Sequence, residues 1–313
     1  MTTVCITGAA GNLGGLTARH LFENTDFQLH LMLHHKPLSP GLGPSPRLNT
    51  FHCDLAHPRS LDACLHGVDE IVHYAGILFK ANPEKFLPTT NTVYFQNLVD
   101  AAKRQGVRRI TLISFPHVEG PTSPTDPSTD RLDRMPVSAH ARTRLEEERI
   151  LQREYPDSVV LRVGMVYGRG ILMPDAARWF ARRRLLGVWK QPTPIHLISK
   201  HDFLASVHAT LANPSLRGTH NIGDEGHQTL QEFLDFCCQR WNCPRPWRMP
   251  LWLIRTAARL FEAFSWATGS QSPLTRDFIE IGRVPYWGDT TSMRSQILPV
   301  LRYRTLRDGQ ETL

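Results

Sequence analysis

The chain has 313 residues, of which 41% are hydrophobic and 21% charged, and its formal net charge is +7. This length suffices for one large α/β unit with a smaller lobe, far above the size at which burying a core is difficult. No stretch reaches the roughly 18 uninterrupted apolar residues of a membrane span. No basic segment followed by an apolar run opens the chain as a secretory signal would. We therefore expect a cytoplasmic protein with no membrane span.

The basic charge raises the question of nucleic-acid binding, because cationic proteins attract phosphate backbones without sequence preference. The arginines are scattered, however, and their densest cluster, Arg182 to Arg184, lies on an expected helix beside Trp179 and Phe180. The sequence therefore favours no nucleic-acid partner. The cysteines lack CxxC spacing, so we expect reduced, mostly buried thiols, no disulfide framework and no metal site.

The N-terminus carries the clearest motif. An apolar β run, Val4 to Thr7, breaks at a glycine, two more glycines follow at intervals of three, and a helical pattern begins at Leu13. In such a turn the N–H groups at the helix N-terminus hold a pyrophosphate, and glycine permits its close approach. The alternative is an ordinary glycine-rich turn. The residues predicted to bind the cofactor here are Gly8, Ala10, Gly11, Asn12, Leu13 and Gly14.

The next apolar run predicts which dinucleotide binds. Phe27 to Leu33 is an expected strand that ends in His34, His35 and Lys36. The residue about 20 positions past the glycines reads the adenosine ribose, where an acid suits a 2′-hydroxyl and a cation suits a 2′-phosphate. His34 occupies this place, which favours NADP(H) over NAD(H). The alternative is that these are surface residues leading into the loop Pro37 to Pro46.

Strands and helices then alternate. Thr50 to Cys53 is an expected strand ending at Asp54 and Leu55, where Asp54 is placed to bind the adenine amino group. Glu70 to Tyr74 is a strand that opens onto Ala75 and Gly76. This rhythm predicts an α/β fold with a doubly wound, parallel Rossmann sheet. Further expected elements are the helices Pro58 to Leu65, Val93 to Gly106 and Ala139 to Gln152, the strands Arg109 to Ser114 and Val159 to Val163, and the loop Glu119 to Pro136.

The second half predicts a smaller lobe. Residues 1–170 are the expected dinucleotide-binding domain, and 195–226 return to it through Ile195 to Ser199, Asp202 as a helix N-cap, and a strand at Thr219 to Ile222. Residues 171–194 and 227–313 form the expected substrate lobe. Leu230 to Trp241 and Pro250 to Ala267 are apolar, aromatic-rich helices. We expect this mostly helical lobe to close over the cofactor.

The chain resembles the extended short-chain dehydrogenase/reductases, within the NAD-dependent epimerase/dehydratase-like superfamily, and in particular their hydroxysteroid dehydrogenase and dihydroflavonol reductase branch. The motifs that carry the resemblance are TGAAGNLG at 7–14, CDL at 53–55, HYAG at 73–76, NLVDAAKRQGVRRI at 97–110, LRVGMVYGRG at 161–170, HNIGD at 220–224 and SPLT at 272–275.

The resemblance implies a catalytic Ser or Thr after the central strand, and a Tyr and a Lys four residues apart on the following helix. Here Phe115 stands at the serine position with Ser114 beside it, His140 stands at the tyrosine position, and Arg144 stands at the lysine position. The catalytic candidates are therefore His140, Arg144, Ser114 and Tyr74.

The two replacements have different consequences. Arg144 still offers donors for a ribose hydroxyl and stays charged. His140 can shuttle a proton near neutral pH, but an arginine one turn away disfavours the imidazolium, so we expect a neutral ring that is a better base than acid. The alternative is a polar helix face left after loss of the tyrosine. Tyr74, His117 and Tyr167 are other groups expected near the nicotinamide, with Tyr74 and Tyr167 more typical of core or pocket walls.

These observations favour an NADP(H)-dependent oxidoreductase or epimerase-like enzyme acting on a bulky, largely apolar small molecule, and they leave a homodimer open. The apolar substrate rests on the aromatic C-terminal lobe. Two alternatives remain: a redox-silent NADP(H) sensor, which the replaced catalytic positions favour, and a cyclase or isomerase that keeps the cofactor for structure.

Overall fold

A computed structural model describes residues 1–38, 41–76, 82–268, 272 and 274–313. Ser39 and Pro40 of the expected Pro37 to Pro46 loop lie outside the described residues, as does Pro273 of the SPLT motif. In the described part of the chain, no helix is both long and apolar enough to cross a membrane.

A seven-stranded sheet forms the centre of the molecule, in the order β11-β6-β5-β4-β1-β2-β3. Every neighbouring pair in it is parallel. This confirms the predicted doubly wound α/β fold, because the order reverses beside β1 as it does in dinucleotide-binding folds. The strands of the sheet are β1 (Thr3–Thr7), β2 (Gln28–Leu33), β3 (Leu48–His52), β4 (Glu70–His73), β5 (Arg109–Ser114), β6 (Val159–Val163) and β11 (Gly218–Ile222).

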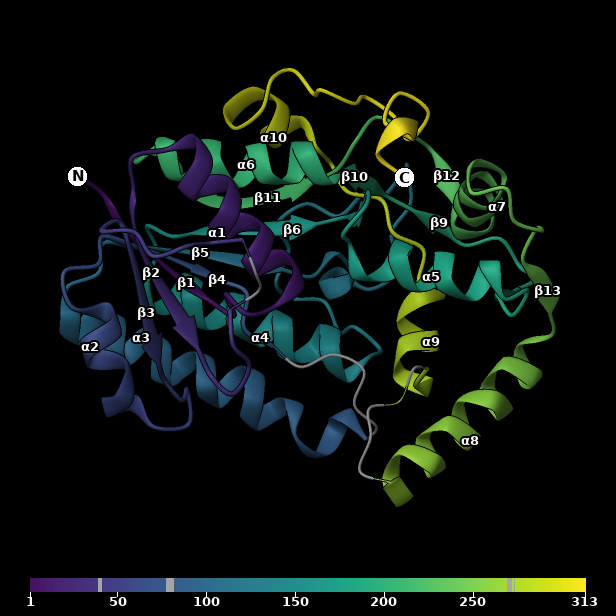
Figure 1. Cartoon of the computed structure of the whole chain (residues 1–313), viewed down its shortest axis with the longest axis horizontal. Helices are drawn as coiled ribbons and strands as arrows, with labels where there is room; N and C mark the ends of the chain where they lie inside the picture. Colours follow the sequence, from purple (N-terminus) through teal and green to yellow (C-terminus); the bar gives the residue numbers. More distant parts are fainter. Residues whose placement is uncertain (39–40, 77–81, 269–271, 273) are drawn as a thin grey trace.

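Helices cover both faces of the sheet (Figure 1). On one face α1 packs beside α6, and apolar residues of both helices share a core with β1, β2 and β6. On the other face α2, α3 and α4 bury a second core against β4 and β5. The helices of this domain are α1 (Asn12–Asn24), α2 (Asp62–Leu65), α3 (Tyr94–Gln105), α4 (Ala139–Glu154) and α6 (Lys200–Ala212).

The remaining elements form a lobe beside the carboxyl end of the sheet, with its own apolar core. The predicted helices at 230–241 and 250–267 are present as α7 and α8. The cysteines are free thiols, and all but Cys243 are buried, as predicted. The elements are β7 (Met165–Tyr167), α5 (Leu172–Arg182), β8 (Gly187–Trp189), β9 (Pro194–Ile195), β10 (Leu197–Ser199), β12 (Gln228–Thr229), α7 (Leu230–Arg240), β13 (Trp247–Met249), α8 (Leu251–Thr268) and α9 (Arg276–Gly282). The last helix, α10 (Thr291–Gln296), packs instead on β11 and adds Met293 to the core of the sheet domain.

The segment Ile195 to Ser199 differs from its prediction. It divides between β9 and β10, and β10 pairs with β7 rather than with the central sheet. The N-cap of α6 is Ser199, whose Oγ accepts from the Asp202 N–H at 3.0 Å. The predicted cap, Asp202, instead accepts from the backbone N–H groups of Arg302 and Tyr303, so its carboxylate fastens the C-terminal segment to α6.

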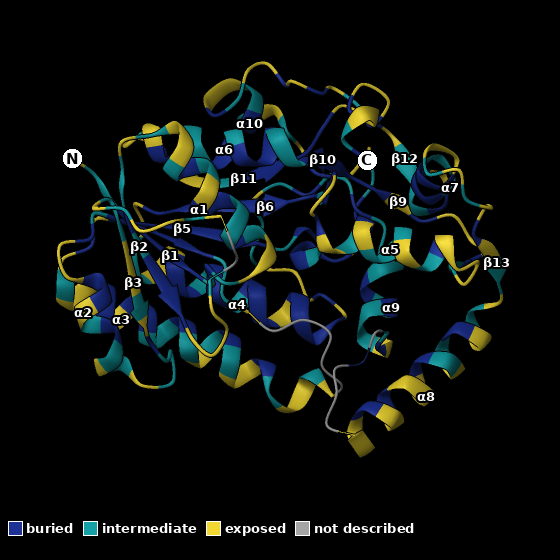
Figure 2. Cartoon of the chain, viewed as in Figure 1, coloured by how far each residue is buried: buried dark blue, intermediate teal, exposed yellow. Residues whose placement is uncertain are grey.

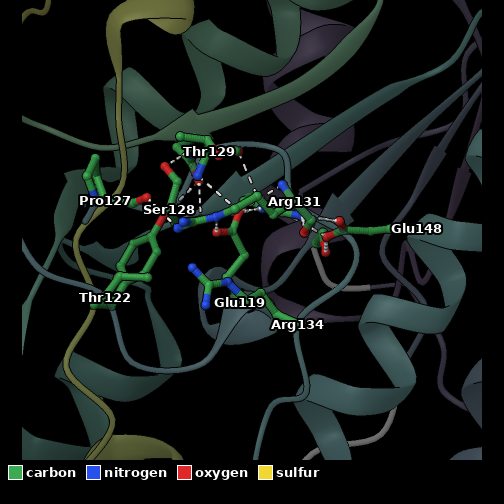
Figure 3. A network of polar contacts seen from close by, with 12 residues as sticks. Glu119, Thr122, Pro127, Ser128, Thr129, Arg131, Arg134 and Glu148 are labelled. Carbon is green, nitrogen blue, oxygen red and sulfur yellow. Dashed lines mark hydrogen bonds and ion pairs between the residues drawn. The ribbon is translucent and has the colours of Figure 1, made fainter.

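A buried ion-pair network joins β6, α4 and the loop before α4 (Figure 3). Arg162 of β6 is fully buried between Glu119 and Glu148, and it donates to both carboxylates. Glu119 also accepts from the Arg131 side chain at 2.6 Å and from its backbone N–H at 3.1 Å. Because two cations face two carboxylates, the network is close to neutral, which reduces the cost of burying its charges.

Removing the central cation should strongly destabilise the protein. Arg162→Met leaves the Glu148 carboxylate buried without its cation, and loss of one partner of a buried pair typically costs about 3–5 kcal/mol. Urea denaturation measures this loss. The matched control is Arg217→Met, which removes an exposed pair with Asp157 and should cost less than about 1 kcal/mol. Equal losses in the two variants would show that the network does not hold the fold.

Candidate functional site

The glycine turn lies between β1 and α1, and its geometry requires glycine. Gly8 has φ +66°, and an added Cβ there would come within 3.1 Å of the Ala75 nitrogen. An added Cβ at Gly11 would lie 2.9 Å from the Gly8 carbonyl oxygen, which already accepts from the Gly11 N–H at 2.8 Å. A Cβ at Gly14 would crowd the same carbonyl. The turn is therefore closed by contacts that a side chain would break.

The turn leaves a helix N-terminus suited to an anion. Gly11 is the N-cap of α1, it has no side chain with which to cap the helix, and the first turn carries no acidic residue. The first N–H groups of a helix have no partner within it, and the helix dipole is positive at this end. The predicted residues Ala10 and Leu13 are half-buried against the core, whereas Asn12 is exposed. These features fit the pyrophosphate of a dinucleotide.

The predicted adenosine-reading residues lie together at the ends of β2 and β3. His34 Nε2 is 3.8 Å from Asp54 Oδ2, and the His34 and His35 rings are tilted by 38° to each other with centroids 3.6 Å apart. The Asp54 carboxylate also accepts from the Ala56 N–H at 2.9 Å, which is the largest cause of its lowered pKa. The Leu55 carbonyl accepts from the Asn97 side chain at 2.8 Å.

The end of β4 is tied to the end of β1. The Thr7 hydroxyl accepts from the N–H groups of Tyr74 and Ala75, at 3.1 and 3.2 Å. The Tyr74 hydroxyl lies 2.6 Å from the hydroxyl of Thr17 on α1. Burial raises the pKa of Tyr74 above its ordinary value. The Tyr74 hydroxyl is thus held by α1 and stays protonated.

Arg144 connects α4 to this edge of the sheet. Its guanidinium donates to the Ala75 carbonyl at 3.2 Å and to the buried Glu147 carboxylate at 2.6 Å. It lies so close to Gly76 that any Cβ there would collide with it. The structure therefore brings Arg144, Ala75 and Gly76 together. Burial raises the pKa of Glu147 to about 7 in spite of the neighbouring guanidinium.

His140 lies one turn before Arg144 on α4 and is buried. Its ring meets the Phe115 ring edge to face, with centroids 4.8 Å apart. Burial is the main cause, and Arg144 the second, of a lowered pKa of about 3 for His140. The sequence predicted a neutral ring from Arg144 alone, so the direction is confirmed but the larger cause was missed.

The other candidates are held by partners of their own. Ser114 donates to the buried Glu148 carboxylate, so its hydroxyl belongs to the Arg162 network. Tyr167 is fully buried and donates to the Thr305 carbonyl at 3.2 Å, as a core aromatic would. His117 donates from Nε2 to the Val284 carbonyl at 3.1 Å, and burial lowers its pKa to about 4. His117 thereby links the loop after β5 to the C-terminal segment.

The aromatic side chains expected to form a substrate lid do not line an enclosed space. They are 40% to 85% exposed, mostly along α8. The apolar pattern of α8 predicted a helix correctly, but it could not show which face of the helix packs. The residues are Trp247, Trp252, Leu253, Phe261, Phe264 and Trp266.

A cavity of about 300 Å³ lies in the lobe, and the sequence did not predict it. Asp224 lines it with one buried carboxylate oxygen that has no partner among the described residues, and burial raises the pKa of Asp224 to about 7. The Trp287 ring stacks between His227 and His196, at 4.1 and 5.1 Å. Of the residues that line this cavity, the sequence motifs included only Asp224, in HNIGD. The three rings come from distant parts of the chain, so no local pattern could predict that they meet.

Comparison with known proteins places the site in a family. A family model described as NAD(P)H-binding matches residues 8–169, from the glycine turn to just beyond β7. The chain belongs to the NAD(P)H-binding family. Uronate dehydrogenase of Pseudomonas putida KT2440 is 30% identical over 115 residues, which are 37% of this chain and 41% of that protein. For uronate dehydrogenase of Agrobacterium fabrum the identity is 30% over 132 residues, 42% and 46% of the two chains.

Solved structures share the fold of this NAD(P)H-binding chain over its whole length. MoeE5 in complex with UDP-glucuronic acid and NAD has a TM-score of 0.74 at 19% identity, covering 99% of this chain and 97% of that one. A dTDP-glucose 4,6-dehydratase from Bacillus anthracis in complex with NAD has a TM-score of 0.77 at 15% identity, covering 100% and 95%. These likenesses confirm the predicted Rossmann fold. The curated relatives match over less than half of their own length.

Gly11 offers a test of the glycine turn. Gly11→Ala places a methyl group where the turn closes and where a pyrophosphate would meet the backbone, so NADPH binding should weaken at least tenfold. Gly43→Ala is the control, because an added Cβ there meets no described atom within 4 Å. Isothermal titration calorimetry measures both. If the folded Gly11→Ala protein bound NADPH with wild-type affinity, the turn would not be part of the cofactor site.

Burial of a neutral His140 ring should make the free energy of unfolding depend on pH. Because the pKa of His140 is about 3 in the folded protein and about 6.5 in an unfolded chain, the unfolded state binds more protons below pH 6.5, and stability falls as the pH falls. His140→Phe should therefore lose about 2 kcal/mol less stability than the wild type between pH 7 and pH 5. Urea denaturation at both pH values measures the difference. His66→Phe, an exposed position, is the control, and an unchanged pH slope in His140→Phe would contradict the burial of a neutral ring.

Proposed function

We propose that this protein is an NADP(H)-dependent oxidoreductase in which a neutral His140 replaces the usual catalytic tyrosine. The observation that carries the proposal is that one edge of the sheet unites the glycine turn, the His34 and Asp54 pair, the Ala75–Gly76 backbone, and α4 with His140 and Arg144. Parallel sheets bind dinucleotides at this edge. The chemistry that a bound nicotinamide supplies is hydride transfer.

The residues of this chain have separate tasks in the proposal. Arg144 is charged and is held by Glu147 and the Ala75 carbonyl, so it positions the loop after β4 and offers remaining donors to a ribose hydroxyl. His140 is neutral, so one ring nitrogen can accept the proton of a substrate hydroxyl while the other keeps its own. Ser114 supports α4 through Glu148 rather than touching substrate.

An apolar substrate is supported by the rings around His140. Phe115 contacts the His140 ring, and His117 contacts Phe115 with centroids 4.9 Å apart. The described surroundings of His140 thus offer few charges besides Arg144. The uronate dehydrogenases offer the contrasting substrate class, a sugar acid. Reduction and oxidation assays with apolar ketones and alcohols beside uronates would decide between the two.

A redox-silent NADP(H) sensor is the second candidate. The observation that favours it is the commitment of Ser114 to Glu148 together with Phe115 at the serine position, which leaves the substrate oxygen without a hydroxyl donor there. The sensor predicts cofactor binding with no hydride transfer to any member of the substrate panel. If the protein is a cyclase or isomerase, it should turn over substrate without net consumption of the cofactor.

His34 should decide the cofactor preference. His34→Asp sets a carboxylate against the 2′-phosphate, so the Kd for NADPH should rise at least tenfold while that for NADH changes little. Fluorescence titration with both cofactors measures the two constants. His66→Asp introduces the same charge at an exposed site outside the edge and should leave both unchanged. A wild-type protein with equal affinity for NADPH and NADH would overturn the preference.

His140 should decide the chemistry. His140→Phe keeps an aromatic ring but cannot accept a proton, so kcat should fall by roughly 10² to 10⁴, as for a lost general base. His140→Tyr should retain part of the rate, and the Kd for NADPH should change little in both variants. Steady-state kinetics with the best substrate of the panel measures these values. Unchanged kcat in His140→Phe would show that another group or water accepts the proton.

A further inference from the structure

Most residues of helix α8 are exposed (Figure 2), and large apolar residues are among them. Its buried positions, Ile254, Ala258, Glu262 and Ser265, include a carboxylate and a hydroxyl. Six of its exposed positions hold large apolar side chains, and the only acid in the helix is the buried Glu262. An ordinary surface helix has the opposite arrangement, with its apolar stripe against the core. The exposed apolar residues are Trp252, Leu253, Leu260, Phe261, Phe264 and Trp266.

A small set of contacts fixes the orientation of α8 on the lobe. Ile254 and Ala258 belong to the core of the lobe. Arg255 donates to Glu280 of α9 at 2.7 Å, and the buried Glu262 accepts from the Arg276 side chain at 2.7 Å. Polar anchors therefore fix which face points inward, and α8 lies at the periphery of the molecule beyond α9 (Figure 1).

The apolar face continues past the start of α8. Trp247 of β13 is 65% exposed, and its indole N–H donates to the Arg184 carbonyl at 3.0 Å. Leu185 and Trp179 are exposed beside that turn. We call α8 with Trp179, Leu185 and Trp247 the outer patch. Large exposed apolar side chains thus occur on α8, on β13 and in the turn that β13 contacts, and exposed apolar side chains in such number mark a binding surface.

The rim of the outer patch is cationic. Several arginines there are exposed, and none of them forms an ion pair with a described residue. Arg183 lies instead over the Trp179 ring, 3.7 Å from its centroid. The nearby acids are already paired, Asp235 with Arg248 and Glu280 with Arg255. The exposed arginines are Arg182, Arg183, Arg184, Arg240, Arg245 and Arg259.

We propose that the outer patch binds the surface of an anionic lipid bilayer, with α8 lying in the plane of the interface. Tryptophan near both ends of the helix, aliphatic and phenyl groups between them, and arginines at the rim are the composition of an interfacial amphipathic helix. The helix of 18 residues lies on the membrane and does not cross it.

Vesicle flotation tests the proposal. The full-length protein should float with vesicles of phosphatidylcholine containing 30% phosphatidylserine, and at least tenfold less with phosphatidylcholine alone or at 1 M salt, where surface charge is screened. Trp252→Glu with Phe264→Glu should reduce the binding constant for the anionic vesicles at least tenfold. Arg183→Glu with Arg184→Glu should do the same at low salt.

The matched control is Val300→Glu, an equally exposed apolar position outside the outer patch, and it should bind as the wild type does. Thermal melting shows that each variant is folded. Absence of flotation with anionic vesicles would overturn the proposal, as would an equal loss in Val300→Glu. A wild-type dimer in light scattering that Phe264→Glu converts to a monomer would assign the patch to a second copy instead.

Discussion

The buried guanidinium of Arg162 is the constraint on which the candidate site depends. It fixes Glu148 of α4 and Glu119 of the loop after β5 from a single position on β6. Since Ser114 also donates to Glu148, the same carboxylate joins β5 to α4. A buried charge tolerates little displacement, because each lost contact leaves another charge without a partner. The network therefore sets the position of α4, and α4 carries both His140 and Arg144.

The buried positions of His140 and Arg144 on α4 also determine which charges the candidate site carries. Arg144 forms an ion pair at the edge of the sheet with a buried partner, Glu147. His140, one turn earlier, has no carboxylate partner among the described residues and loses its charged form mainly to burial. The position that holds a tyrosine in the family which the chain resembles thus holds a neutral imidazole beside Phe115. A neutral ring has a free nitrogen for a substrate proton, but the burial that keeps it neutral also makes it a weaker base and an unpopulated acid at neutral pH.

Local rules predicted the sheet domain well. Alternating apolar runs and glycine turns are short-range signals, and the parallel sheet follows from the crossover connections they require. The glycine turn is the best case, because Gly8, Gly11 and Gly14 are needed by the backbone itself.

Predictions that depended on long-range contacts were less accurate. Nothing near Asp202 reveals that its carboxylate binds the backbone at Arg302, and nothing near Ser114 reveals Glu148. The apolar residues of α8 predicted a helix but not its outward face, since the anchors at Glu280 and Arg276 lie on a later segment. The largest cause of the His140 pKa shift was missed for the same reason, because burial is a property of the folded chain.

Nitrogen NMR of the histidine rings tests the central claim most directly. In protein labelled with ¹⁵N-histidine, with the His140 signal assigned from the His140→Phe variant, the ring should show the neutral pattern at pH 6, and its shifts should change when NADPH is added. That result would place a neutral imidazole at the cofactor-binding edge. A His140 ring that is protonated at pH 6, or one whose signals do not respond to NADPH, would contradict the account.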